Sequence, residues 1–305
     1  MISLEKEYLD KIAEQIFPTH GRSEKQYELF KERFYPNNYQ CTTTEIAKGL
    51  SQRDRQAINY EGGLPQTIKE IIKKINNVFR EELEANGITE DQIGCGKQQG
   101  EPGRRSAQTK SPWEIVYQWL WGDKYSLWLQ DYIWENWKQT AQTSRNWLEF
   151  SPLSSEYASK GIKIPPGISK KRIPAHTPLN LKIEIDCSQS YLILFNLGKT
   201  LQGEITKYLI TPSQAFAPHY QLRDKNLFIP QEDALCEDLQ FNTEGIEEFM
   251  AIVIDRPLSL PWLNPNLEDP AFKWQGKHLG QLWEELKGGQ YQWQIFYCDV
   301  NITIF

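Results

Sequence analysis

The sequence predicts an α+β protein made of two modules, an all-α N-terminal half and an antiparallel β-sandwich in the C-terminal half. Three observations lead to this fold class. Up to residue 150, apolar side chains recur every three or four positions, which is the spacing of one helix face. From residue 179 onward, apolar and polar side chains alternate in short runs, as they do in half-buried strands. A proline-rich segment lies between the two patterns.

Residues 1–93 are expected to form a helical module, for which a family resemblance given below implies a winged-helix-like fold. Helical periodicity is found in four stretches, residues 3–17, 23–35, 42–50 and 65–83. Thr42 and Glu45 have the spacing of a capping box, in which each side chain bonds the backbone N–H of the other residue. Pro65 suits the first turn of the longest helix, and Gly87 suits its C-terminal cap.

The segment after this module is expected to be a flexible loop, residues 94–112, because it is rich in glycine, proline and polar residues. Residues 113–150 hold seven of the 11 tryptophans and predict two or three helices, broken near Gly122 and Asp123. These tryptophans fill a core or form an exposed docking surface, and the sequence leaves both open. The candidate partner-binding residues are Trp121, Trp128, Trp134 and Trp137.

Residues 151–178 contain five prolines and are interpreted as a linker, because proline disfavours regular structure. Residues 179–305 are expected to form the β-sandwich-like domain, with short strands separated by glycine and proline. A short helix is predicted at residues 278–289. In the last strand the alternation shifts at Cys298, which predicts a bulge or bend.

The composition indicates an intracellular protein outside the membrane. The net charge of −6 gives no global attraction for nucleic acid or anionic lipid. No stretch approaches the roughly 18 apolar residues of a membrane-spanning helix, and the charged N-terminus is unlike a signal peptide. The five cysteines are scattered, without a C-x-x-C pair, which argues against disulfides and zinc. We therefore expect a cytoplasmic location.

No motif for catalysis stands out. Lys97 is followed by Gln98, so GCGKQQG does not match a phosphate-binding P-loop. The four histidines lack metal-ligand spacing, although His219 and Cys236 fall in one predicted domain. The pairs Glu232–Asp233 and Glu247–Glu248 are interpreted as solvated charges in loops. We expect no enzyme, cofactor or metal; a hydrolase using Cys236 or Cys298 is the third hypothesis.

DNA binding is the alternative to protein binding. The helix from Thr42 and the long helix from Pro65 resemble a helix-turn-helix, whose second helix contacts DNA. Its candidate phosphate-binding residues are Lys69, Lys73, Lys74 and Arg80. Two features weaken the match: residues 51–64 are longer than the usual turn, and residues 1–110 carry equal numbers of basic and acidic side chains.

Two parts of the chain resemble known families. Residues 23–110, through TEIAKGL and IKEIIKKINNVF followed by GCGKQQGEPG, resemble the winged-helix-like modules of cyanobacterial signalling and conflict proteins. Residues 179–260 resemble an uncharacterised β-sandwich family through four segments in order: YLILFNLGKTLQG, YLITPS, NLFIP and GIEEFMAIVIDRPL.

The second resemblance implies an accessory role, because that family occurs beside caspase-like peptidase or kinase domains and has no established catalytic residues. We therefore expect a non-catalytic adaptor or regulatory protein in a bacterial defence or signalling system. Its partner is expected to be another protein, for which the resemblance suggests a caspase-like peptidase.

Overall fold

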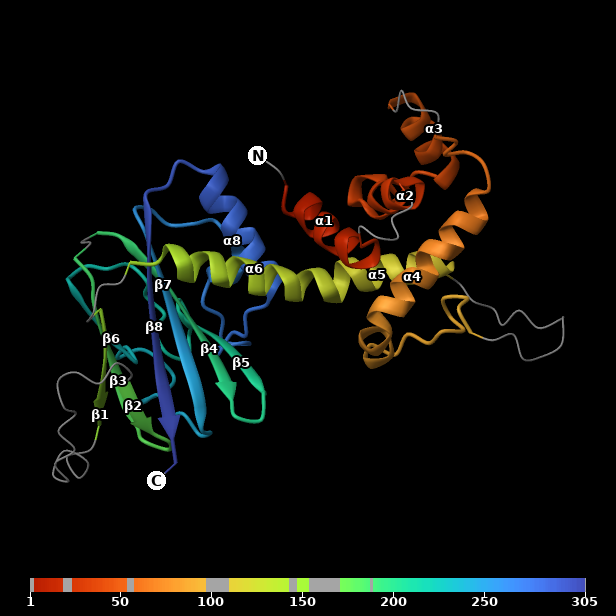
Figure 1. The fold of residues 1–305 in the computed structure, drawn as a ribbon. Helices are drawn as coiled ribbons and strands as arrows, with labels where there is room; N and C mark the ends of the chain where they lie inside the picture. Colours follow the sequence, from red (N-terminus) through yellow and green to blue (C-terminus); the bar gives the residue numbers. More distant parts are fainter. Residues whose placement is uncertain are drawn as a thin grey trace. The chain divides into compact units, whose positions relative to one another are not determined.

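The structure is a computed structural model that describes residues 3–18, 24–53, 58–96, 110–142, 147–153, 171–186 and 189–304. These residues form a mixed α+β protein, with helices mostly in the N-terminal half and sheets in the C-terminal half (Figure 1). The chain divides into two compact units, Met1–Trp128 and Leu129–Phe305. The boundary falls inside the helix α6, Tyr125–Thr140.

In the described part of the first unit, all regular elements are helices. They are α1 (Leu4–Ile16), α2 (Glu24–Phe34), the 3-10 turn η2 (Pro36–Asn38), α3 (Thr43–Arg53), α4 (Leu64–Ala85), α5 (Pro112–Trp119) and the π-helical turn η3 (Leu120–Lys124). The four predicted N-terminal helices are confirmed. The winged-helix assignment stays a prediction.

Local signals position several helix ends as predicted. The backbone N–H of Thr42 donates to Glu45 Oε2 at 2.7 Å, and the N–H of Glu45 donates to Thr42 Oγ1 at 3.2 Å. Gly87 follows α4 with φ of 73°, a left-handed conformation that glycine adopts without strain. A second capping box, Ser111–Glu114, starts α5 inside the segment predicted as a loop. Residues 97–109 of that loop lie outside the described residues.

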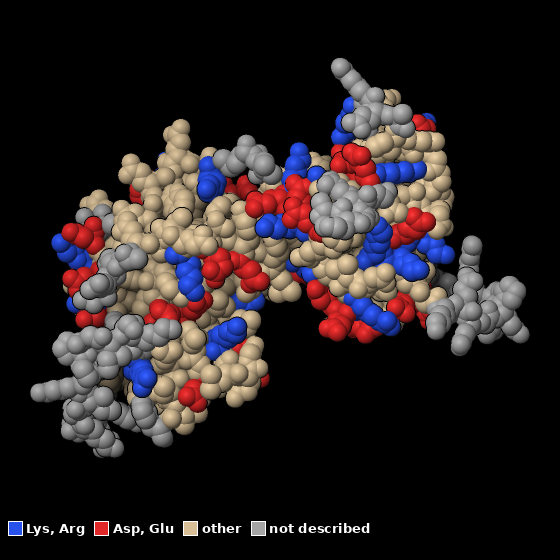
Figure 2. Space-filling view, viewed as in Figure 1, with Lys and Arg blue, Asp and Glu red and all other residues tan. Residues whose placement is uncertain are grey.

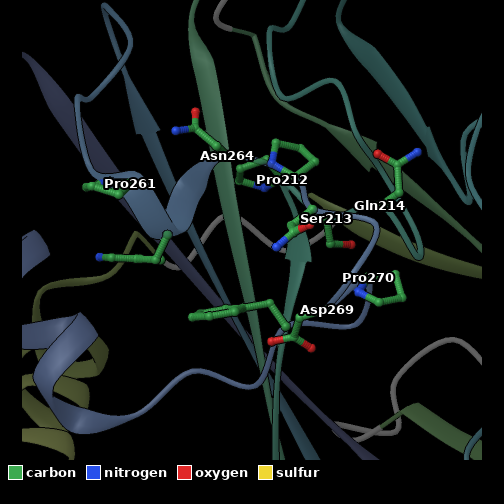
Figure 3. Close-up of a pocket in the computed structure, with 11 residues that line it drawn as sticks. Pro212, Ser213, Gln214, Pro261, Asn264, Asp269 and Pro270 are labelled. Atoms are coloured by element: carbon green, nitrogen blue, oxygen red, sulfur yellow. The ribbon is translucent and has the colours of Figure 1, made fainter.

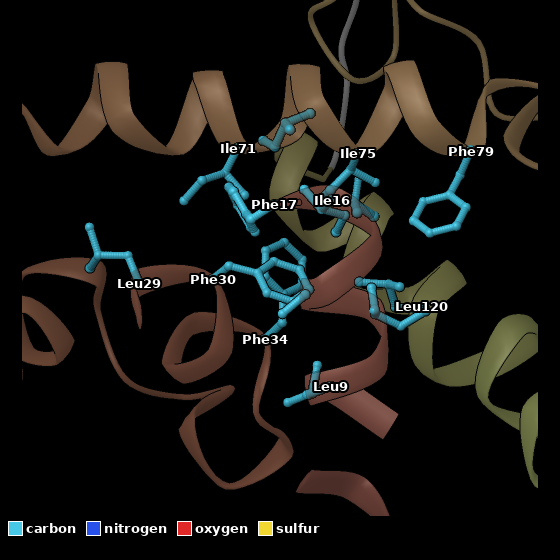
Figure 4. Close-up of a cluster of buried hydrophobic side chains, with 14 of the residues drawn as sticks. Leu9, Ile16, Phe17, Leu29, Phe30, Phe34, Ile71, Ile75, Phe79 and Leu120 are labelled. Atoms are coloured by element: carbon cyan, nitrogen blue, oxygen red, sulfur yellow. The ribbon is translucent and has the colours of Figure 1, made fainter. Parts of the chain in front are cut away.

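The core of the first unit lies between the amphipathic faces of α1, α2, α4 and α5 (Figure 4). Ile71, Ile75 and Phe79 line one side of α4 at intervals of four residues, and all three are buried. Phe30 packs against Phe34, with ring centroids 5.0 Å apart. Helical periodicity therefore identified the buried faces correctly.

The interruption predicted near Gly122 and Asp123 is confirmed: the π turn η3 contains both residues and separates α5 from α6. The backbone keeps a right-handed helical conformation at Leu120 and Tyr125, so the α-helical hydrogen bonding changes there without the chain turning away. A Cβ atom at Gly122 would meet nothing within 4 Å, so packing does not require this glycine. Burial of the neighbouring Trp119 and Leu120 outweighs the cost of about 1 kcal/mol for glycine in a helix.

The second unit contains two sheets, α6 from Leu129 onward and a C-terminal helix, α8 (Gly276–Gly288). One sheet has the order β1-β3-β6, with β1 at Leu148–Pro152, β3 at Leu179–Glu184 and β6 at Asn226–Ile229. The other has the order β2-β8-β7-β4-β5. Its strands are β2 (Lys171–Pro174), β4 (Tyr191–Thr200), β5 (Ile205–Thr211), β7 (Gly245–Ile254) and β8 (Trp293–Thr303). A short 3-10 turn, η4 (Pro261–Leu263), precedes α8.

Both faces of the five-stranded sheet are covered. Phe249 of β7 packs against Phe150 of β1, with ring centroids 5.5 Å apart, and one hydrophobic cluster includes residues of both sheets. On the opposite face, Phe195 of β4 stacks on Trp137 of α6. The helix α8 lies close to α6, because a Cβ atom at Gly280 would come within 3.0 Å of Leu129.

Two strands lie where helix or linker was predicted. The helical segment ends at Thr140, and Leu148 begins β1. Pro174 ends β2, whose pairing with β8 is parallel, so this sheet is not purely antiparallel. Each of the two strands is at the edge of its sheet, where proline costs no ladder hydrogen bond. Residues 154–170 of the predicted linker lie outside the described part of the chain.

The bulge predicted at Cys298 is also wrong. Residues of β8 pair with β7 without a register shift from Trp293 to Ile302. Ile295 and Phe296 are both buried because the sheet is covered on both faces, and this removes the alternation on which the prediction relied. Among the described residues, no helix is long and apolar enough to cross a membrane.

Candidate functional site

A pocket of about 270 Å³ in the second unit is the candidate functional site. It lies among the C-terminal part of α6, Gln142 just after this helix, α8 and the start of β8. We call it the tryptophan pocket and define it by its lining residues, Asn136, Trp137, Thr140, Gln142, Trp283, Lys287, Trp293, Gln294 and Ile295. Aromatic walls with a few polar groups are typical of binding sites.

The indole rings are positioned by regular elements. Trp137 is only 1% exposed and stacks on Phe195 of the sheet, with ring centroids 6.4 Å apart. Trp283 of α8 lies 6.1 Å from the Trp137 ring. One helical turn later, Lys287 places its Nζ 4.7 Å from the centre of the Trp283 ring. Trp293, the first residue of β8, is half-buried.

Most of the polar side chains in the pocket keep hydrogen-bonding capacity. Thr140 donates to the carbonyl of Asn136, and Asn136 Nδ2 donates to the carbonyl of Tyr132. Gln142 and Gln294 are exposed and form no side-chain hydrogen bond to a described residue. None of the described lining residues is acidic, so Lys287 is the only charged group in the wall.

The indole N–H of Trp137 is buried without an acceptor. Its Nε1 has no hydrogen-bond partner among the described residues. A buried donor without an acceptor costs about 1–3 kcal/mol, and few native side chains tolerate it. Trp134, one turn earlier, satisfies its own indole N–H by donating to Glu248 Oε2 at 2.9 Å.

The four tryptophans predicted to bind a partner have different environments. Trp121 and Trp128 are half-buried in the first unit and pack against Tyr8, with centroids 5.3 and 5.4 Å apart. Trp134 is 3% exposed and stacks on Trp274, so it belongs to the core. Of the four, only Trp137 lines the pocket.

Sequence reasoning missed the remaining pocket residues. Trp283, Lys287 and Trp293 are more than 140 positions from Trp137 in the sequence. The i,i+4 spacing of Trp283 and Lys287 on a predicted helix was the available local signal. Neither that spacing nor the start of a strand indicates which face of another helix lies opposite.

The basic residues of the DNA-binding alternative do not form one open basic row. Lys69 and Lys73 are exposed on α4. Lys74 is half-buried, with its Nζ 4.9 Å from the Phe17 ring, and Arg80 forms ion pairs with Glu84 and Glu90. On the face shown in Figure 2, basic and acidic side chains are interspersed.

A second cavity, of about 140 Å³, lies beside the cis peptide bond Thr211–Pro212 (Figure 3). We call it the proline cleft. Its lining residues are Pro212, Ser213, Gln214, Pro261, Trp262, Asn264, Pro265, Asn266, Asp269, Pro270 and Phe272. Trp262 stacks on Phe272, and His278 packs against both rings. Burial first, and Lys277 second, lower the pKa of His278 to about 4, so this imidazole is neutral at pH 7.

Of the two cysteines of the hydrolase hypothesis, Cys236 lacks the environment of a reactive thiol. Burial and the nearby Asp238 raise the pKa of the Cys236 thiol, opposite to the shift that activates a thiolate. His219 pairs with Asp233, at 2.7 Å. Among the described residues, no group of three or more His, Cys, Asp or Glu side chains is arranged to hold a metal ion.

The two acidic pairs differ from each other. Glu232 and Asp233 are exposed in a loop, as predicted. The prediction of a loop for Glu247 and Glu248 is wrong, because both are half-buried in β7. Glu248 accepts hydrogen bonds from Trp134, Lys138 and Tyr297, and Glu247 accepts one from Asn196.

No protein-family model, no curated protein and no solved structure matches this chain. The family resemblances of residues 23–110 and 179–260 therefore stay predictions.

Proposed function

We propose that this protein is a non-catalytic interaction protein that binds a partner protein through the tryptophan pocket. The observation that carries the proposal is the convergence of Trp137, Trp283 and Trp293 on one open pocket. Tryptophan is enriched among the residues that contribute most to binding energy at interfaces. Lys287, Gln142 and Gln294 surround the rings as an exposed polar rim, the usual surroundings of an aromatic anchor.

The polar groups of the pocket suit recognition better than catalysis. Its wall offers amides, a hydroxyl, indole rings and one ammonium group. The hydroxyl of Thr140 donates to backbone carbonyls, and no carboxylate or imidazole is among the described lining residues. Such groups orient a ligand through contacts and hydrogen bonds without supplying a general acid–base pair.

The wider setting comes from the resemblances. A winged-helix-like first module and a β-sandwich-like second module are consistent with an accessory protein beside a peptidase effector. In this proposal the second unit binds the partner, and the first unit provides a separate interaction surface. The cytoplasmic location belongs to the same proposal.

The test is a comparison of proteins captured by the full chain and by pocket variants. Trp293→Ala and Trp283→Ala should each lose a specific partner that the wild-type protein retains after nuclease treatment. Phe228→Ala is the control, because Phe228 is an exposed aromatic residue of β6 that does not line the pocket. If both pocket variants retain every partner, the pocket does not bind the partner.

DNA binding is the second candidate function. Lys69 and Lys73 favour it, because both are exposed and lie one turn apart on α4. The neutralisation of Arg80 by two carboxylates weighs against it.

A further inference from the structure

We propose that the ligand of the tryptophan pocket is a proline-rich segment of the partner in the polyproline II conformation. This inference rests on the proposed function and specifies its ligand. A polyproline II segment has a rigid apolar surface and loses little conformational entropy when it docks on aromatic side chains. The pocket offers such side chains from three separate elements: α6, α8 and β8.

The aromatic walls are fixed before any ligand binds. Trp137 is held by Phe195 beneath it, and Trp283 is held between Trp137, Tyr132 and the ammonium group of Lys287. Trp293 begins a strand that pairs with β7. Pre-positioned rings reduce the entropic cost of binding, and the flat faces of indoles suit the ring of proline.

The hydrogen-bonding groups of the pocket wall match a ligand that mainly accepts hydrogen bonds. The indole N–H groups of Trp283 and Trp293, the Lys287 ammonium group and the amides of Gln142 and Gln294 are donors, whereas the indole N–H of Trp137 is buried. The only acceptor side chains are amide oxygens and the Thr140 hydroxyl, because no described lining residue is a carboxylate. A polyproline II segment makes no internal hydrogen bonds, and each proline offers a carbonyl but no N–H.

The same comparison argues against a sugar. Each sugar hydroxyl donates a hydrogen as well as accepting one, so a sugar site needs acceptors in comparable number to its donors. The proline cleft contains a carboxylate, Asp269, whereas the tryptophan pocket has none among its described lining residues. The excess of hydrogen-bond donors over acceptors in the wall of the tryptophan pocket therefore favours a proline-rich peptide over a sugar.

The charge of the wall predicts which proline-rich segments bind best. Lys287 is exposed at the rim and is the only charged residue among the described residues that line the pocket. A segment with acidic residues beside its prolines gains a favourable contact with Lys287, whereas a segment with basic residues is repelled. The preferred ligand is therefore a proline-rich segment with an acidic flank.

The test is calorimetric titration of the full-length protein with decaproline and with proline-rich peptides of the same length that carry acidic or basic flanks. A glycine–serine peptide of equal length is the negative control. We expect proline-rich peptides to bind and the control peptide not to bind. Trp293→Ala should weaken binding about tenfold or more, whereas Phe228→Ala should leave it unchanged.

Lys287→Glu gives an independent result if Trp293→Ala fails to fold, because Lys287 is exposed. The wild-type protein should prefer the acidic flank about threefold over the basic flank, and Lys287→Glu should reverse this preference.

The inference is overturned if no proline-rich peptide binds, or if binding is unchanged in Trp293→Ala and Lys287→Glu. If a neutral oligosaccharide binds and the proline-rich peptides do not, the pocket is a sugar site. If Trp293→Ala loses the captured partner but the proline-rich peptides do not bind the wild-type protein, the proposed function stands and only the ligand class is wrong. If neither partner nor peptide depends on the pocket, both proposals fail.

Discussion

Glu247 and Glu248 are neighbours in β7 with opposite pKa shifts, because successive strand residues point to opposite faces of the sheet. Burial raises the pKa of Glu247, and one hydrogen bond from Asn196 only partly offsets it. Burial also acts to raise the pKa of Glu248, but hydrogen bonds from Lys138, Tyr297 and Trp134 outweigh it, so that pKa is lowered. Three donors against one account for the difference.

Glu248→Gln should therefore destabilise the protein most at neutral pH. A carboxyl whose pKa is lowered by folding contributes stability above its unfolded pKa, near about 4.3, and loses it as the pH falls through the folded value. We expect the free energy of unfolding to fall by about 2 kcal/mol at pH 7, with a smaller difference in acid. Urea unfolding at several pH values measures this. Glu184→Gln is the control. Glu184 is exposed and paired with Lys182, so this substitution should change the free energy of unfolding little.

Glu247→Gln should have the opposite effect. A carboxyl whose pKa is raised by folding loses stability as the pH rises through its folded value, and glutamine does not ionise. The substitution should raise the free energy of unfolding at pH 7–8 by about 1 kcal/mol, and the gain should vanish in acid. Urea unfolding of Glu247→Gln at several pH values measures this difference. A loss of stability at pH 8 would show that the Glu247 carboxylate is stabilised by its surroundings.

Among the elements, α3 is specified by its own sequence. The capping box of Thr42 and Glu45 satisfies backbone N–H groups that the first turn leaves without partners. Thr42→Ala should lower the free energy of unfolding by about 1 kcal/mol. Thr44→Ala is the matched control, because Thr44 is exposed in the first turn of the same helix. Equal effects of the two substitutions in thermal unfolding would contradict the role of the cap.

The start of β7 depends instead on close packing between strands. A Cβ atom at Gly245 would lie 2.2 Å from the backbone oxygen of Lys199 in β4. Gly245→Ala should therefore separate the two strands and destabilise the protein by about 2 kcal/mol or more. Gly288→Ala is the control, because a Cβ atom there would meet nothing within 4 Å. Urea unfolding of both variants measures the difference, and a neutral Gly245→Ala would show that β4 can move.

At the scale of the whole molecule, charge bears on the DNA-binding alternative. The net charge is −6. Of the four candidate phosphate contacts, Lys74 is half-buried and Arg80 is paired with carboxylates, which leaves Lys69 and Lys73 exposed and without an ion pair to another described residue. We expect weak duplex binding that falls steeply with salt, and no further loss when Lys69, Lys73 and Lys74 are replaced by Glu. Fluorescence anisotropy with a labelled duplex measures both. Tight binding that this triple variant abolishes would favour the DNA-binding function.

Local sequence patterns predicted the positions of the N-terminal helices correctly. Periodicity located α1, α2, α3 and α4, because a helix that covers a core buries one face at every turn. The same reasoning failed for β8, where both faces are covered, and for the edge strands β1 and β2, where proline is tolerated. A pattern rule is reliable only when the element has one buried and one exposed face.

The sequence by itself determined the mixed α+β class, the order of helices before strands and the capping box of Thr42 and Glu45, because these depend on residues close together in the chain. The tertiary structure decided which tryptophans are core and which line a pocket. Trp134 and Trp137 lie one helical turn apart, yet Trp134 donates to the half-buried Glu248 carboxylate and Trp137 has no acceptor among the described residues. That difference depends on side chains of β7, α8 and β8, whose positions are set by long-range packing and not by local sequence.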